Sequence, residues 1–201
     1  MHSWLISILW IATALGLVAG EARPARTLTN LQLAHRSETN ARATYEGCAK
    51  KAEAEGYLGV AALFRASAIA EGVHAEAHLA VLRKLGPVPR TELQPRPPLS
   101  TKENLEQAIR VEALEETSLY PAFIRVAKEE GHKAALQSFT FAKNAEREHK
   151  SLYAEALNDL EGWRLHRAFL VCTLCGYTVP KIPLEKCSFC SAAKKSLLEV
   201  P

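Results

Sequence analysis

Glu71-Gly72-Val73-His74 and Glu146-Arg147-Glu148-His149 are two copies of one pattern, Glu-x-x-His, 75 residues apart. Residues three apart share a helix face, so each copy presents a carboxylate and an imidazole to one point. A further carboxylate precedes each copy at a matched distance, Glu38 by 33 residues and Glu112 by 34. One Glu from each of two helices plus Glu-x-x-His from two others is the ligand set of di-iron and di-manganese bundles. The pattern predicts an all-α four-helix bundle around two metal ions.

Start and stop signals divide the chain into four helices, with approximate spans 30–55, 57–85, 101–130 and 132–160. Capping boxes are predicted to open the first at Thr29 and the third at Ser100, because each is followed three residues later by Gln or Glu. Pro121 lies inside the third span. Because proline lacks a backbone N–H, we expect a kink just after Tyr120.

Residues 86–100 hold five of the ten prolines and are predicted to be a linker. Fifteen extended residues reach about 50 Å, whereas a 28-residue helix is about 42 Å long. The linker can therefore cross the whole bundle, as the ferritin-like topology with one long crossover requires.

The two halves of the chain also repeat. Seven identities share the 75-residue spacing: Tyr45/Tyr120, Ala52/Ala127, Glu55/Glu130, Gly56/Gly131, Phe64/Phe139, Glu71/Glu146 and His74/His149. A duplicated helical hairpin is the simplest explanation. It would also deliver the candidate ligands with near two-fold symmetry.

Four of the five cysteines form two C-x-x-C pairs near the C-terminus: Cys172, Cys175, Cys187 and Cys190. Four thiolates at this spacing favour a tetrahedral zinc or iron site over disulfides. Zinc would be structural and redox-silent, whereas iron would pass single electrons. Cys48 stands alone and is expected to be a small buried apolar residue.

The net charge of +3 comes from 25 basic and 22 acidic residues of mixed sign, which argues against nucleic acid as a partner. The sequence has no Gly-rich phosphate loop, no serine triad and no catalytic Cys-His pair. A nicotinamide cofactor is therefore expected on a partner reductase and not on this chain.

Residues 1–20 contain no Lys, Arg, Asp or Glu, and the run from Trp4 to Ala19 is nearly all apolar. Such a run is a secretory signal or a membrane anchor. We expect the protein to be exported, either with this segment cleaved off or with the protein tethered to the membrane through residues 3–20. The alternative is the cytoplasmic face of the membrane, because Arg23 and Arg26 follow the run. The predicted divisions are a leader (1–22), a bundle (27–162) and a four-cysteine domain (167–198).

From residue 27 to residue 198 the chain resembles the rubrerythrin family. The first half carries Glu38 with Ala41-Arg42 and Tyr45, then residues 52–57, then Glu71-x-x-His74. The second half carries Glu112-x-x-Glu115, Tyr120-Pro121, residues 128–131 and Glu146-x-x-His149. The tail is similar to the family's rubredoxin-like domain, whose first knuckle is Cys-x-x-Cys-Gly-Tyr. The resemblance implies a ferritin-like di-iron bundle followed by a small rubredoxin-like domain.

The resemblance also implies a role for each ligand. Glu71 and Glu146 would bridge the two irons, and Glu112 and His149 would bind one of them.

Glu38 would bind the other iron together with Glu115 or His74, which exchange as the oxidation state changes. Tyr45 and Tyr120 would donate hydrogen bonds to ligating carboxylates.

The activity implied by the resemblance is reduction of hydrogen peroxide to water. It would need two irons in the bundle and one iron, or zinc, in the four-cysteine site. Electrons would pass from an unidentified donor protein through that site to the di-iron pair of a neighbouring subunit in a head-to-tail homodimer. The alternatives are a ferroxidase and a non-enzymatic, metal-binding electron carrier with a zinc tail.

Three residues depart from the family's pattern. Ser188 replaces a proline in the second knuckle, and Leu197 stands where an aromatic is common. Both put the redox potential of the tail in question. Gly72 lies next to a ligand in mid-helix and costs about 1 kcal/mol relative to alanine.

Overall fold

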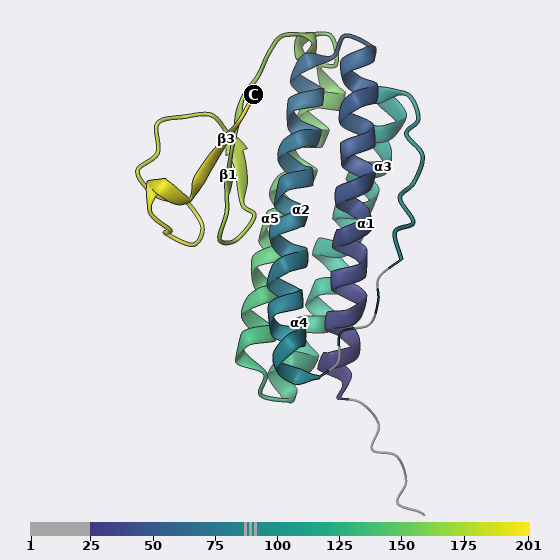
Figure 1. Ribbon diagram of the computed structural model, residues 1–201. Coiled ribbons are helices and arrows are strands. Elements are labelled where there is room, and N and C mark those ends of the chain that lie inside the picture. Colours follow the sequence, from purple (N-terminus) through teal and green to yellow (C-terminus); the bar gives the residue numbers. More distant parts are fainter. Residues whose placement is uncertain (1–24, 87, 89, 91) are drawn as a thin grey trace, which may run out of the picture.

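A computed structural model describes residues 25–86, 88, 90 and 92–201 of the chain. Four long helical segments lie side by side, and a small three-stranded lobe lies against one face of them (Figure 1). The helices are α1 (Arg26–Ala54), α2 (Leu58–Leu85), α3 (Thr101–Leu114), α4 (Tyr120–Glu129) and α5 (Lys133–Asn158). α3 and α4 together form the third long segment, so the predicted four-helix bundle is confirmed.

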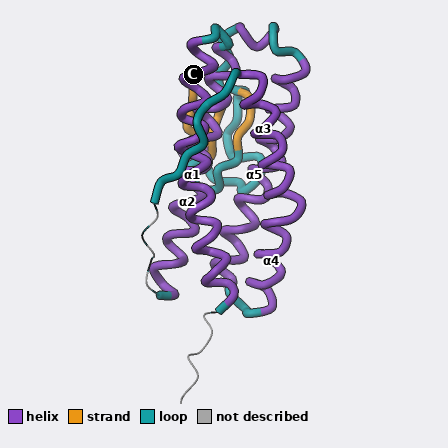
Figure 2. The backbone as a smooth tube through the Cα atoms, turned by 90° about the vertical axis from the view of Figure 1, so that its right-hand side faces the viewer, coloured by secondary structure: helices purple, strands orange, loops and turns teal. Residues whose placement is uncertain are grey.

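The end of the crossover lies along the outside of the bundle beside α1 (Figure 2). The side chain of Asn40 accepts a hydrogen bond from the Gln94 N–H at 2.6 Å, and the Thr44 hydroxyl accepts one from the Arg96 N–H at 3.1 Å. These side chains satisfy backbone groups of residues 92–100 that form no regular structure. The crossover is therefore fixed to the first helix.

The start of α3 agrees with the predicted capping box. The Ser100 side chain accepts from the Glu103 N–H, and the Glu103 carboxylate accepts from the Ser100 N–H. A second carboxylate joins this cap from the other hairpin, because Glu55 accepts from both the N–H (2.8 Å) and the hydroxyl (2.6 Å) of Thr101. Hydrogen bonding lowers the pKa of Glu55 to about 2, and the bond from the Thr101 hydroxyl contributes most.

The start of α1 corrects the prediction. The helix begins at Arg26, upstream of the proposed box at Thr29, and its N-cap residue forms no side-chain cap. Glu130 supplies the acceptor instead, binding the N–H groups of Arg26 (3.2 Å) and Thr27 (2.9 Å). Local pattern could not reveal this cap, because the carboxylate comes from the end of α4. Each hairpin thus caps the first helix of the other.

A π-helical turn, Glu115–Leu119, separates α3 from α4. The Tyr120 N–H donates to the carbonyl of Glu115, five residues back. The predicted irregularity is present, but it lies before Tyr120 and not after it. Proline both lacks an N–H and clashes with the carbonyl four residues earlier, so Pro121 displaces the preceding turn.

Aromatic side chains fill the bundle on both sides of the buried polar centre. Tyr45, Phe64 and Tyr153 pack with ring centroids 5.1–5.8 Å apart. Tyr120 packs in a second cluster with two phenylalanines of α4 and α5. Among the described residues, no helix is both long and apolar enough to cross a membrane. The predicted leader lies outside the described residues and stays a prediction.

The C-terminal lobe contains an antiparallel sheet with strand order β2-β1-β3. Its strands are β1 (Phe169–Cys172), β2 (Thr178–Pro180) and β3 (Leu197–Val200). Trp163 is buried in the short 3₁₀ turn Gly162–Arg164 and stacks on Phe169 with centroids 6.2 Å apart. These two residues belong to the apolar core of the bundle. Trp163 therefore packs the junction between bundle and lobe.

Candidate metal centres

The structure brings the seven predicted bundle ligands together in the middle of the helices, and all seven are buried. Ligand atoms within 4.8 Å of one another define two groups. They are Glu38, Glu71, His74 and Glu146, and Glu71, Glu112, Glu146 and His149. Glu71 and Glu146 belong to both groups, the position expected of bridging carboxylates.

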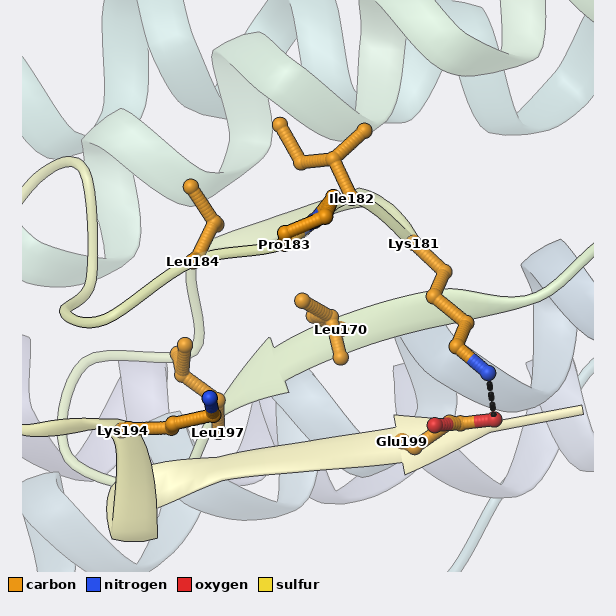
Figure 3. A pocket seen from close by; sticks show the side chains of 8 residues that line it. All are labelled: Leu170, Lys181, Ile182, Pro183, Leu184, Lys194, Leu197 and Glu199. Carbon is orange, nitrogen blue, oxygen red and sulfur yellow. Dashed lines mark hydrogen bonds and ion pairs between the residues drawn. The ribbon is translucent and has the colours of Figure 1, made fainter.

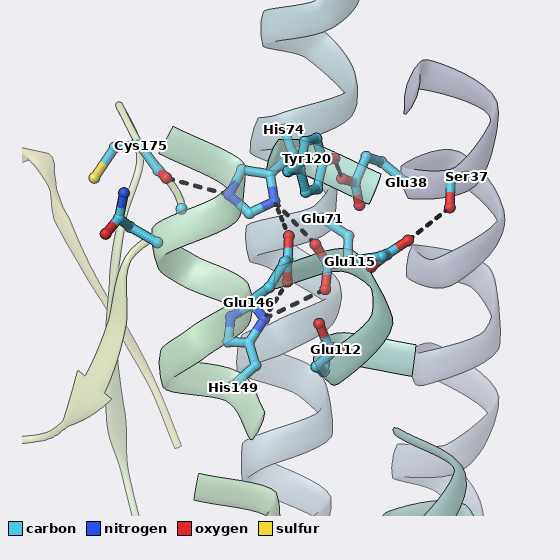
Figure 4. Close-up of polar contacts among 12 residues, drawn as sticks. Ser37, Glu38, Glu71, His74, Glu112, Glu115, Tyr120, Glu146, His149 and Cys175 are labelled. Carbon is cyan, nitrogen blue, oxygen red and sulfur yellow. Dashed lines mark hydrogen bonds and ion pairs between the residues drawn. The ribbon is translucent and has the colours of Figure 1, made fainter. Parts of the chain in front are cut away.

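The two histidines direct the same nitrogen into the centre (Figure 4). His74 Nδ1 lies 2.9 Å from Glu71 Oε2 and 3.4 Å from Glu146 Oε1. His149 Nδ1 lies 3.1 Å from Glu146 Oε2 and 3.4 Å from Glu71 Oε1. Each bridging carboxylate thus faces both imidazoles. The two halves contribute to the centre with the symmetry that the repeat predicted.

Two tyrosine hydroxyls hold the remaining carboxylates. Tyr45 donates to Glu112 Oε1, and Tyr120 donates to Glu38 Oε1. The second oxygens, Glu38 Oε2 and Glu112 Oε2, are buried without a hydrogen-bond partner. A buried carboxylate oxygen without a partner is costly, so these atoms fit a bound cation.

Glu115 is buried in the π-helical turn but belongs to neither ligand group. It accepts a hydrogen bond from the Ser37 hydroxyl at 2.9 Å. Burial, followed by the charges of Glu146 and Glu71, raises the pKa of Glu115 to about 8. In this structure the ligand group that contains Glu38 includes His74 and not Glu115.

The electrostatics of the centre also fit two cations. Burial and the charges of the bridging carboxylates raise the pKa of both Glu38 and Glu112. Burial alone would lower the pKa of His149. Its hydrogen bonds to Glu146 and Glu71 outweigh burial and raise this pKa to about 9. Each of these shifts favours the protonated form of its group, as expected where several carboxylates are buried together. The carboxylates of the two groups carry four negative charges when ionised, which two divalent ions would balance.

The outward nitrogens of both histidines are bound by the lobe. The His74 Nε2–H donates to the Cys175 carbonyl at 3.2 Å, and the His149 Nε2–H donates to the Thr178 hydroxyl at 3.1 Å. Thr178 in turn donates to the Gly176 carbonyl at 3.0 Å. Such partners fix the tautomer and orientation of a metal-binding imidazole. Sequence reasoning missed Thr178, which no spacing rule connects to His149.

His78, for which the sequence suggested only a surface or a satisfied core position, is buried with partners for both ring nitrogens. Burial lowers its pKa to about 3, so the ring is neutral. The Ser138 hydroxyl donates to Nδ1 at 2.7 Å, and Nε2–H donates to the Tyr120 hydroxyl at 3.3 Å. Tyr120 then donates to Glu38. The available signal was the position of His78, four residues after His74 and on the same face of α2.

The four predicted cysteines converge in the lobe, with their sulfur atoms within 4.8 Å of one another. Cys172 Sγ and Cys190 Sγ lie 3.6 Å apart, and Cys175 Sγ and Cys187 Sγ 3.7 Å apart. A tetrahedral ion with metal–sulfur bonds of about 2.3 Å places its sulfurs about 3.8 Å apart. None of the described cysteines forms a disulfide. The sulfur positions therefore fit one metal ion.

A hollow of the lobe lies on the side of β1 and β3 (Figure 3). Leu170, Leu197 and Ile182 line it, and an ion pair between Lys181 and Glu199 at 2.6 Å borders it. None of the candidate ligands lines this hollow. Leu197, the position where an aromatic is common, therefore faces an apolar surface.

Comparisons with known proteins find relatives that match most of the chain. Residues 29–157 match the sequence profile of the family described as rubrerythrin. Nigerythrin of Nitratidesulfovibrio vulgaris is 37% identical over 169 residues, covering 84% of this chain and 83% of the relative. Rubrerythrin of Porphyromonas gingivalis is 33% identical, covering 83% of this chain and 86% of the relative. The solved structure of fully reduced, all-ferrous nigerythrin superposes with a TM-score of 0.82 at 34% identity, covering 91% of both chains.

Proposed function

Because the chain belongs to the rubrerythrin family, we propose that it is a non-haem di-iron peroxidase that reduces hydrogen peroxide to water. The balanced reaction is H₂O₂ + 2 H⁺ + 2 e⁻ → 2 H₂O. The reductant would be an external one-electron donor protein, and iron held by the four cysteines would accept its electrons. Iron in both sites supplies the one-electron chemistry that no side chain of this protein provides alone.

The contact between the two centres carries this proposal. Within one chain, the Cys175 carbonyl accepts a hydrogen bond from His74, so a residue of the four-cysteine site touches a ligand of the two-metal centre. The path that we propose therefore lies within the chain, while the head-to-tail homodimer with a path between subunits stays a prediction. A peroxidase needs a path that brings electrons from an external donor to the two-metal centre. A ferroxidase takes electrons from its ferrous substrate and needs no such relay, and a structural zinc protein needs none either.

The residues of the chain have separate tasks in this function. Glu71 and Glu146 would span the two irons, while Glu38, Glu112 and the two histidines would complete the set. Tyr45 and Tyr120 orient the terminal carboxylates through their hydroxyl groups. The candidate ligands are all buried, which limits the access of bulk water to the centre.

Glu115 lies beside the pair, held by Ser37. With iron bound, Glu115 would be the alternative to His74 as a ligand in one of the two oxidation states, as the family resemblance implies. Glu115 lies in the π-helical turn, and such turns occur frequently at functional sites.

The test is anaerobic mixing of the reduced, iron-loaded protein with hydrogen peroxide. We expect three irons per chain, and we expect the absorption of both centres to change within milliseconds to seconds. A matched variant, Glu38→Ala, removes a bundle ligand and leaves the four-cysteine site intact. If the wild-type bundle stays reduced, the peroxidase proposal fails. Two irons plus one zinc would favour the ferroxidase, and zinc throughout would favour a structural protein.

A further inference from the structure

The two cysteine knuckles have the same backbone conformation. In the first, the Gly176 N–H donates to the Cys172 carbonyl (2.8 Å), and the Cys172 N–H donates to the Tyr177 carbonyl (3.0 Å). In the second, the Ser191 N–H donates to the Cys187 carbonyl at 3.1 Å, and the Cys187 N–H donates to the carbonyl five residues later at 2.8 Å. Gly176 and Ser191 therefore occupy equivalent positions.

Both positions are left-handed, with φ of +75° at Gly176 and +60° at Ser191. Left-handed backbone favours glycine, since a side chain there is usually strained. Yet the second knuckle forms with a serine at this position. The knuckle conformation alone therefore does not explain the glycine of the first knuckle.

The surroundings of position 176 explain why the first knuckle has a glycine there. A Cβ atom at this position would lie 2.1 Å from His74 Nε2, 2.8 Å from His74 Cδ2 and 2.9 Å from His74 Cε1. No side chain fits at these distances. The imidazole cannot retreat easily, because His74 is buried and its Nδ1 faces Glu71 and Glu146.

We propose that Gly176 is a positioning residue that sets the contact between the four-cysteine site and the two-metal centre. Its missing side chain lets the Cys175 carbonyl reach His74 Nε2–H at 3.2 Å. It also leaves the Gly176 carbonyl in place to orient Thr178, which holds His149. The electron-transfer consequence rests on the proposed function, whereas the docking consequence does not.

A side chain at position 176 should separate the knuckle from the bundle without detaching the lobe. Trp163 would still stack on Phe169, a contact that lies outside the first knuckle. The expected defect is therefore a local displacement of the first knuckle away from His74.

The experiment compares Gly176→Ser and Gly176→Ala with Gly131→Ser in the full chain. Gly131 has a similar φ of +73°, but nothing lies within 4 Å of its Cβ position. Gly131→Ser therefore measures the cost of left-handed strain in open space.

The first readout is docking, measured on zinc-loaded protein by amide hydrogen exchange and by the NMR signal of the His74 Nε2 proton. We expect the Gly176 variants, and not Gly131→Ser, to lose this signal and to exchange faster in residues 175–178. Retention of the signal in Gly176→Ala would overturn the proposal.

The second readout is the rate at which the reduced iron of the four-cysteine site is reoxidised after peroxide is added. Misplacement by about 1 Å can slow a positioned reaction by about 100-fold, so we expect a loss of about 10- to 100-fold. The absorption spectrum of this iron should stay unchanged. Its loss in Gly176→Ser would show that the knuckle itself needs glycine and would also overturn the proposal. A wild-type protein inert to peroxide would refute the peroxidase function, while the docking result would stand.

Discussion

Each ligand histidine makes contacts on both sides of its ring. Nδ1 faces the bridging carboxylates, and Nε2–H is held by the lobe through Cys175 or Thr178. These outer hydrogen bonds determine which nitrogen is free to bind a cation. The lobe thus contributes to the metal centre of the bundle without supplying a ligand to it.

Replacing Thr178 with valine should weaken metal binding in the bundle. The change keeps the shape but removes the acceptor for His149 Nε2–H, and loss of such a partner costs about 10- to 100-fold in metal affinity. Competition with a chelator measures the affinity. Thr173→Val is the matched control, because Thr173 is exposed and its hydroxyl donates only to the Ser196 carbonyl. Equal affinities in the two variants would contradict the assigned role.

Metal loading of the bundle should release protons at pH 7. The pKa of His149 is raised to about 9 in the metal-free protein, so its ring carries both protons at pH 7, and a cation at Nδ1 must expel one. We therefore expect affinity to rise between pH 7 and 9 and to fall below pH 7. Calorimetry with manganese in buffers of different ionisation enthalpy counts the protons, because thiolates bind manganese poorly. Binding without proton release would refute this account.

Most of the bundle site could be predicted from sequence, because its ligands obey helical spacing. Glu71 and His74 share a face by position alone, and the repeat extends the argument to Glu146 and His149. Ser37 and Thr178 could not be found this way. Their contacts depend on how separate elements pack, and a lone hydroxyl residue has no distinctive spacing.

At the scale of elements, the first helix of each hairpin begins with help from the other hairpin. The Glu55 carboxylate caps the N-terminus of α3, and the Glu130 carboxylate caps the N-terminus of α1. Both carboxylates precede a left-handed glycine, Gly56 or Gly131, that ends the preceding helix. A single short segment thus stops one helix and starts another.

Glu55→Ala should destabilise the protein by about 1 kcal/mol, the usual loss for a helix cap. For a chain of this size that corresponds to a fall in Tm of about 2–4 °C. The pKa of Glu55 is lowered to about 2, so its stabilisation is present above pH 4.5 and disappears as the pH falls through 2. Thermal unfolding across this range measures the difference.

Glu53→Ala is the matched control for this prediction. Glu53 is exposed and pairs only at the surface with Arg65, at 3.5 Å. Such pairs contribute little. A stability difference between wild type and Glu55→Ala that does not change with pH would argue against the charged cap.

The sequence predicted the helices themselves better than their irregular ends. The Ser100 box is local and was found, whereas α1 begins at Arg26 because of a distant carboxylate. Pro121 indicated a distortion, but the clash acts on the carbonyl four residues earlier. The π-helical turn therefore precedes the proline, and it places Glu115 in the interior.

At the scale of the molecule, the lobe depends on its metal more than the bundle does. Around the cysteines, its core holds little beyond Tyr177, Phe189 and Leu197. A core this small rarely supports itself, whereas structural metal sites contribute about 10 kcal/mol or more to folding. The bundle has a continuous apolar interior and no comparable need.

Cys190→Ser should therefore unfold the knuckles while the helices persist. We expect amide protection to be lost in residues 173–196 and retained in α1, α2 and α5. Hydrogen exchange with mass spectrometry resolves the two regions. Cys48→Ala, which alters a buried cysteine of α1, serves as control and should leave the lobe protected. Simultaneous loss in both regions would show that lobe and bundle unfold together.

The exchange of caps and carboxylates between the hairpins has a consequence for how such a fold could arise. Each ligand group takes three residues from one hairpin and a single glutamate, Glu71 or Glu146, from the other. An ancestral half-length chain would have had neither a capped first helix nor a complete metal centre until it formed a dimer with a second copy. A proline-rich crossover that joined two such copies would make their meeting a step within one polypeptide, at the millimolar effective concentration that a short tether provides.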